Sequence, residues 1–97
     1  MKTTYISIGN SDGKLGPAEW TGYWQTVNRA VVGSGFAKSI QGIWHSLVPS
    51  EYVNACWCVE LYPEHVDDLR ELLRRASAKY HQDSVAWAVA KTEFLKP

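Results

Sequence analysis

The order of hydrophobic patterns along this chain limits its fold more than any other feature. Apolar residues alternate with polar ones in four segments, which are residues 3–9, 38–46, 55–61 and 84–90. Between these segments apolar residues recur at helical spacing in two others, which begin at Pro17 and Pro63. Alternation is typical of a half-buried strand, and spacing of three and four is typical of an amphipathic helix. The order predicts an α+β fold, the ferredoxin-like β-α-β-β-α-β arrangement, in which a four-stranded antiparallel sheet carries two helices on one face.

Both helical segments carry end signals. Pro17 suits a first helical position, and Glu19 suits the positive end of the helix dipole. The first apolar stripe consists of Trp20, Tyr23, Trp24, Val27 and Val31, and it ends at Gly33 and Gly35. The second stripe consists of Val66, Leu69, Leu73, Ala76 and Tyr80. Its acidic residues come early and its basic residues late, as the dipole prefers.

The alternation in each strand predicts two sheet faces. The face toward the helices is expected to hold Ile6, Ile8, Ile40, Trp44, Trp57, Val59, Leu61, Val85, Trp87 and Val89. These residues should pack on Trp20, Trp24, Val27, Leu69, Leu73 and Ala76. The face away from the helices, here called the open face, is expected to hold Tyr5, Ser7, Gln41, Ile43, His45, Cys56, Cys58, Glu60, Ser84, Ala86 and Ala88.

The segment NACWCVELYP, residues 54–63, holds both cysteines of the chain. On a strand Cys56 and Cys58 point to the same side, with Cα atoms about 6.5 Å apart, near the upper limit for a disulfide. His45 offers a third metal ligand, but the fourth ligand of a structural zinc site is missing. We therefore expect two free thiols that act as small apolar residues, with no metal and no cofactor.

Length and charge exclude several classes of protein. The 97 residues predict one domain, 1–97, and Lys plus Arg (10) balance Asp plus Glu (10). A nucleic-acid partner is disfavoured, because nucleic-acid binders usually carry an excess of positive charge. No apolar run approaches the roughly 20 residues needed to cross a bilayer, and the N-terminus lacks the apolar core of a signal peptide. The expectation is a cytoplasmic protein without a membrane partner.

Three kinds of chemistry remain open from the residues. A small enzyme or small-molecule binder would use His45 as acid or base beside Glu60 or Cys58, in a pocket between the open face and a second subunit. The loop from Gly9 to Gly16 leads into a helix N-terminus that suits an anion, although a plain turn also explains it. An RNA binder would need exposed aromatic residues on the central strands, whereas the tryptophans are expected to face the helices.

A non-enzymatic binding module is the preferred interpretation. The open face combines small and moderately polar residues, which suits close approach of another surface, and a homodimer would cover it. A monomer with a solvated face is the alternative. The expected contact residues are Trp44, His45, Cys56, Cys58 and Glu60 on the sheet, together with Asp12 and Lys14 in the first loop. Trp44 and Trp20 lie toward element ends, where a tryptophan can anchor a partner.

The chain also resembles a group of small proteins from actinobacteria and their phages that have no assigned activity. The matching residues are Asp12, Glu19 and Trp20, the segment Asn54 to Glu60, the segment Gln82 to Trp87, and Thr92 to Phe94. The resemblance covers nearly the whole chain. It implies a compact α+β accessory protein that binds and modulates a host or defence macromolecule, and it assigns no catalytic residue.

Overall fold

The structure, a computed structural model, describes residues 1–10, 13–46 and 54–97. The elements, in chain order, are β1 (Lys2–Gly9), α1 (Pro17–Asn28), a π-helical turn (Arg29–Gly33), β2 (Ala37–His45), β3 (Asn54–Leu61), a 3-10 turn (Pro63–His65), α2 (Val66–Lys79) and β4 (Ala86–Lys91). Asp12, which sequence reasoning proposed as a contact residue, lies outside the described residues.

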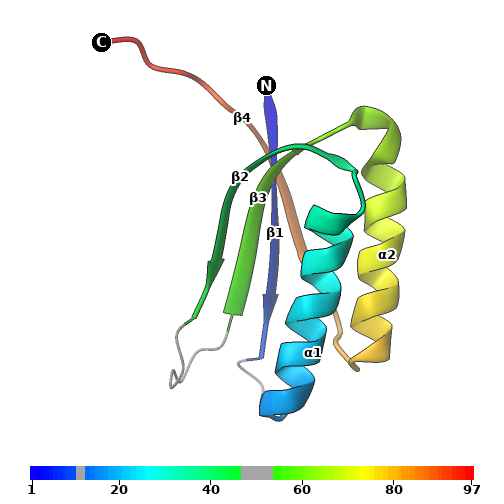
Figure 1. Ribbon diagram of the computed structural model, residues 1–97. Coiled ribbons are helices and arrows are strands. Elements are labelled where there is room, and N and C mark those ends of the chain that lie inside the picture. The colour runs from blue at the N-terminus through cyan, green and yellow to red at the C-terminus, as the bar shows by residue number, and fades with distance from the viewer. Residues whose placement is uncertain (11–12, 47–53) are drawn as a thin grey trace.

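The strands form one four-stranded sheet in the order β2-β3-β1-β4, and every neighbouring pair is antiparallel. Figure 1 shows α1 and α2 side by side over one face of this sheet, with the other face left open. The α+β, ferredoxin-like prediction is confirmed. Strands β1 and β3 form the centre of the sheet, and β1 also pairs with β4, the strand furthest from it in the sequence.

The core is built around Trp57 on the central strand β3. Its side chain is fully buried, and its indole Nε1 donates a hydrogen bond to Asn28 Oδ1 at the end of α1, 2.9 Å away. An indole N–H that is buried needs such a partner, because an unpaired donor costs about 1–3 kcal/mol. The rest of the buried apolar core comprises Ile6, Ile8, Leu15, Tyr23, Val27, Val31, Ala55, Val59, Leu61, Leu69, Leu73 and Ala76.

The two helices meet through aromatic and polar contacts. The Tyr23 ring of α1 stacks on Tyr80 just after α2, with centroids 5.2 Å apart. The Tyr23 hydroxyl also shares a hydrogen bond of 3.3 Å with the Ser77 hydroxyl of α2. Gly22 permits this approach, since a Cβ at that position would lie 2.7 Å from the Tyr80 hydroxyl. The glycine in the helix therefore serves packing between α1 and the end of α2.

Strands β1, β3 and β4 face the directions that their alternation predicts. Residues directly opposite in an antiparallel pair share a face, and Ile6 is paired with both Trp57 and Trp87 on the helix side. Tyr5 is paired with Cys58 and with Ala88 on the open face. Val89 does face the helix side, but it is 55% exposed because it lies on an edge strand.

Strand β2 contradicts the prediction over its second half. Ile40 is paired with Val59 on the helix side, but the next pair is Gly42 with Cys58 on the open face, so the register shifts between them. An extra residue in one strand reverses every side chain that follows it. Ile43 consequently faces the helix side. Trp44, expected in the core, lies instead on the open face, opposite Cys56, and is 56% exposed.

Candidate functional site

Trp44 is the largest exposed feature of the open face. Its ring lies over the backbone of Gly42, since a Cβ placed on Gly42 would come within 2.5 Å of the far end of that ring. One side of the Trp44 ring thus packs against the backbone of β2, and the other side is exposed to solvent. A rigid aromatic side chain of this kind is well suited to anchor a partner, because little conformational entropy is lost when it becomes buried.

Tyr5 and Cys58 form a pair at the centre of the same face. They lie opposite each other on β1 and β3, with Tyr5 40% exposed and Cys58 almost buried. The hydrogen bond and charge interaction with the Cys58 thiol raise the pKa of Tyr5 above its ordinary value, and partial burial and Cys56 add to the effect. A phenol is neutral near neutral pH even at its ordinary pKa, so Tyr5 offers a hydroxyl to any surface that packs here.

The two thiols point to the open face, as predicted, and both are free. Cys58 donates a long hydrogen bond to Gln41 Oε1, at 3.6 Å, and Cys56 lies 3.9 Å from the carbonyl oxygen of Trp57. Gln41 Oε1 also accepts from the hydroxyl of Thr3, which is buried and contacts the Thr92 hydroxyl. Small polar contacts thus fill the sheet surface between the aromatic side chains.

Glu60 completes the open face at the far end of β3. Its carboxylate lies 3.7 Å from Lys38 Nζ and accepts a weak hydrogen bond of 3.5 Å from the Ser39 hydroxyl. An exposed ion pair of this kind contributes at most about 1 kcal/mol. The pair places no unbalanced charge on the open face. On β4 the open face consists of Ala86, Ala88 and Ala90.

His45 does not lie on the open face, which corrects the sequence prediction. It is paired with Ala55 on the helix side, and its ring contacts the Trp24 ring of α1 at a centroid distance of 5.5 Å. The sheet therefore separates His45 from Cys58 and Glu60. A nucleophile and a base must come within hydrogen-bond reach, so the expected set of His45 with either residue is not assembled.

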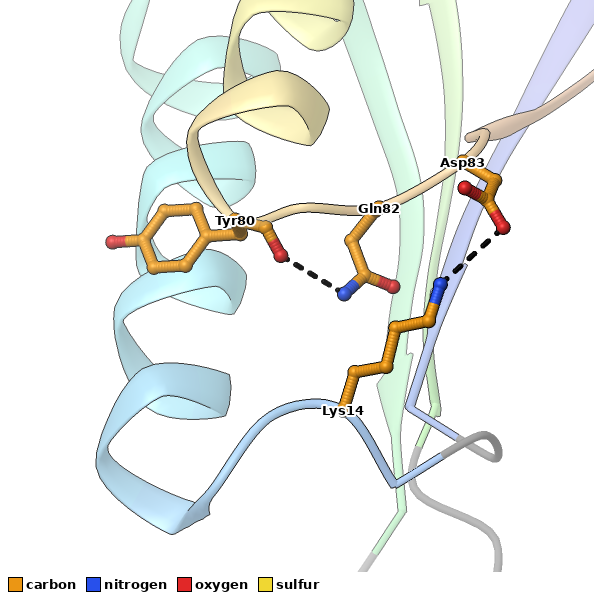
Figure 2. A network of polar contacts seen from close by, with 4 residues as sticks. All are labelled: Lys14, Tyr80, Gln82 and Asp83. Atoms are coloured by element: carbon orange, nitrogen blue, oxygen red, sulfur yellow. Dashed lines mark hydrogen bonds and ion pairs between the residues drawn. The ribbon is translucent and has the colours of Figure 1, made fainter.

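Lys14 lies away from the strands, in the connection between β1 and α1. Its Nζ is 3.4 Å from Asp83 Oδ2 in the connection between α2 and β4, and the adjacent Gln82 amide donates to the carbonyl oxygen of Tyr80 (Figure 2). Asn10 contacts the residue after Lys14, donating to the Leu15 carbonyl oxygen at 2.7 Å and accepting from the Leu15 N–H at 2.9 Å. Of these contacts, the Lys14–Asp83 ion pair joins the two connections.

The orientation of Trp44 was missed by sequence reasoning, although a signal for it was present. A lone glycine inside a strand pattern indicates a bulge or a close approach of another group. Gly42 marks both features, because the register shifts just before it and the Trp44 ring covers it.

Across the described ranges, His, Cys, Asp and Glu side chains nowhere gather in a group of three suited to a metal ion. In the same part of the chain, no helix has both the length and the apolar character needed to cross a membrane. No protein-family model matches the sequence, and no curated protein sequence matches it.

Proposed function

We propose that this protein is a non-enzymatic interaction module that binds another protein through the open face. The observation that carries the proposal is the Trp44 ring, 56% exposed and supported by Gly42. Tryptophan and tyrosine dominate the binding energy of protein interfaces, particularly where they are held rigid. Trp44 and Tyr5 supply both residue types on one face.

The chemistry between these aromatics also favours a protein partner. Thiols, an amide and alanines present a surface that is neither strongly charged nor fully apolar, and the Glu60 carboxylate is balanced by Lys38. The cores of protein interfaces are depleted in charge in the same way. Binding is favoured over turnover because the acid–base residue expected for catalysis, His45, contacts Trp24 on the other side of the sheet.

The resemblance to phage and actinobacterial proteins suggests where to look for the partner, namely a host or defence macromolecule. The test is affinity capture from an actinobacterial lysate with the wild-type protein, Trp44→Ala and Tyr62→Ala. Tyr62 is an exposed aromatic residue beyond the last residue of β3, at the start of the 3-10 turn, so it serves as the matched control.

We expect one protein to be captured by the wild type and by Tyr62→Ala, and its recovery to fall at least about tenfold with Trp44→Ala. Bound partner should also slow the labelling of Cys56, which lies opposite Trp44. Equal capture by all three proteins, or unchanged labelling of Cys56 in the complex, would contradict the proposal.

A further inference from the structure

The two edges of the sheet differ in their capacity to accept another strand. The β2 edge is interrupted by two register shifts, between Ala37 and Ser39 and between Ile40 and Gly42. Such bulges are a known protection against pairing with another chain. Strand β4, at the other edge, pairs with β1 without a shift from Ala86 to Lys91 and carries no charge before Lys91. The β4 edge is therefore unprotected.

The hydrogen-bond alternation shows which backbone groups of β4 are free. The Thr92 N–H donates to the Met1 carbonyl oxygen at 2.7 Å, which continues the β1–β4 ladder by one residue. In an antiparallel pair every second residue bonds to its neighbour strand, so the even-numbered residues of β4 face β1. The N–H and C=O groups of Trp87, Val89 and Lys91 consequently point to the free edge.

A hollow lies beside this edge, between α2 and β4. Its volume is about 260 Å³, and its lining includes Leu73, Val85 and Trp87 with Arg70 and Arg74. The Arg70 guanidinium lies 5.5 Å from the centre of the Trp87 ring. Asp83 also lines the hollow but is paired with Lys14, and Arg74 is paired with Glu71. The hollow therefore offers an apolar surface with the Arg70 guanidinium beside it, next to a row of free backbone groups.

The segment that follows β4 carries the two most exposed large apolar residues of the described chain. Phe94 is 73% exposed and Leu95 is 87% exposed. Glu93 precedes them, and Figure 1 shows this segment leaving the sheet as a continuation of β4. Two large apolar residues next to a strand edge indicate a segment that becomes covered in an assembly.

We propose that two copies of this chain pair antiparallel along β4, with the two-fold axis at Ala90, so that residues 92–97 of each copy lie along the β4 edge of the other. In this register Val85 faces the partner's Leu95, and Trp87 faces the partner's Glu93. Both positions are on the helix side, where the hollow and Arg70 lie. On the open face Ala86 faces the partner's Phe94, a large ring against a small side chain.

Charge selects this register over its neighbours. If the partner strand is shifted by two residues so that its Lys91 lies opposite Trp87, this lysine stands beside the Arg70 guanidinium. A shift of two residues in the other direction places the two Lys91 residues directly opposite each other. Like charges directly opposite are destabilising in a sheet, whereas the proposed register puts a carboxylate beside Arg70. A second copy is therefore the occupant that the edge fits.

The proposal does not depend on the proposed function, because it uses the β4 edge and not the Trp44 region of the open face. Pairing would create one eight-stranded sheet whose two open faces lie side by side. Each Trp44 lies on β2, at the opposite edge from β4, and stays available to a partner protein.

The first test is the oligomeric state, measured by sedimentation at concentrations from about 1 to on the order of 100 μM. The wild type should dimerise. Leu95→Asp and Val89→Pro should each raise the dissociation constant at least about tenfold, because proline removes an N–H that points to the free edge. Val89→Thr, which keeps that N–H, should dimerise like the wild type. A wild-type protein that is monomeric throughout, or a dimer weakened by Trp44→Ala and not by Leu95→Asp, would overturn the proposal.

The second test addresses the register in a background where Cys56 and Cys58 are replaced by alanine. Ala90→Cys should form a disulfide-linked dimer on mild oxidation, because the two Cα atoms would lie about 4.5 Å apart across a non-hydrogen-bonded pair. Ala88→Cys, whose counterpart would be the partner's Thr92, should not. Independently, Arg70→Glu and Glu93→Arg should each weaken the dimer, and the double variant should restore it. Equal cross-linking at both positions together with no restoration would refute the register.

Discussion

The Trp44 ring lies directly over Gly42, two residues earlier on the same strand, at a distance that leaves no room for a Cβ. The register shift before Gly42 brings the ring to the open face, and the glycine lets it lie close to the strand. Gly42→Ala should displace the ring toward solvent. Because the displaced ring would move into solvent and leave the buried core unchanged, we expect the free energy of unfolding to change by less than about 1 kcal/mol.

Capture of the partner should nevertheless fall with Gly42→Ala, because the ring loses its fixed position. Urea denaturation and the capture assay measure the two effects separately. If Gly42→Ala lowers the free energy of unfolding but leaves capture unchanged, Gly42 is needed for the structure of β2 and not for the position of the Trp44 ring.

Asn28 is only partly buried, but its replacement should lower the free energy of unfolding more than the replacement of an exposed residue on the same helix. Asn28→Ala leaves the buried Trp57 indole N–H without its acceptor at 2.9 Å, which costs about 1–3 kcal/mol. Gln25→Ala, on an exposed position of the same helix, is the control and should change the free energy of unfolding by less than about 0.5 kcal/mol. Equal effects in urea denaturation would rule out the special role of Asn28.

Alkaline pH should destabilise the fold through Tyr23. Burial raises the pKa of Tyr23 above its ordinary value of 10.0, although the hydrogen bond with Ser77 opposes this. Since the folded state holds the proton more tightly than the unfolded state, stability is full below about pH 10 and declines as pH rises through the folded-state pKa. Tyr23→Phe should show a smaller decline between neutral and strongly alkaline pH in thermal unfolding. An identical decline would exclude Tyr23 as the cause.

The two thiols should react at different rates in the native protein. Cys58 is 5% exposed and lies under Tyr5 and Gln41, whereas Cys56 is half-buried beside the exposed Trp44. A thiol reagent should label Cys56 on the order of tenfold faster or more, since reaction requires access. Cys56→Ser and Cys58→Ser assign the two phases. Equal and rapid labelling of both would mean that the centre of the open face is more accessible than the structure indicates.

Single-stranded RNA should not bind with measurable salt dependence. The open face does carry aromatic residues, but Tyr5 is on central β1 and Trp44 on edge β2, with thiols between them. The chain has no net charge, and RNA affinity depends mainly on neutralising phosphates. Fluorescence anisotropy with a short labelled RNA at low and high salt is the measurement. Binding that weakens steeply with salt would favour an RNA function over a protein partner.

Most of the fold follows from local patterns. The alternation in β1, β3 and β4 correctly assigned Ile6, Trp57 and Trp87 to the helix side and Tyr5 and Cys58 to the open face. These strands pair without a shift between β1 and its two neighbours, so period two holds along their whole length. Pro17 correctly marked the start of α1, and Gly33 is the last residue of the π-helical turn that follows α1.

The candidate site, in contrast, depended on pairing between strands. His45 and Trp44 exchanged faces because the register of β2 against β3 shifts between Ile40 and Gly42, and one extra residue reverses each side chain after it. An edge strand has a neighbour on one side only, which leaves it free to accommodate such a shift. The sequence by itself thus determined the order of elements, the core of the central strands and the position of the thiols. Only the tertiary structure decided which aromatic ring became exposed, because a bulge exists only where two strands are paired.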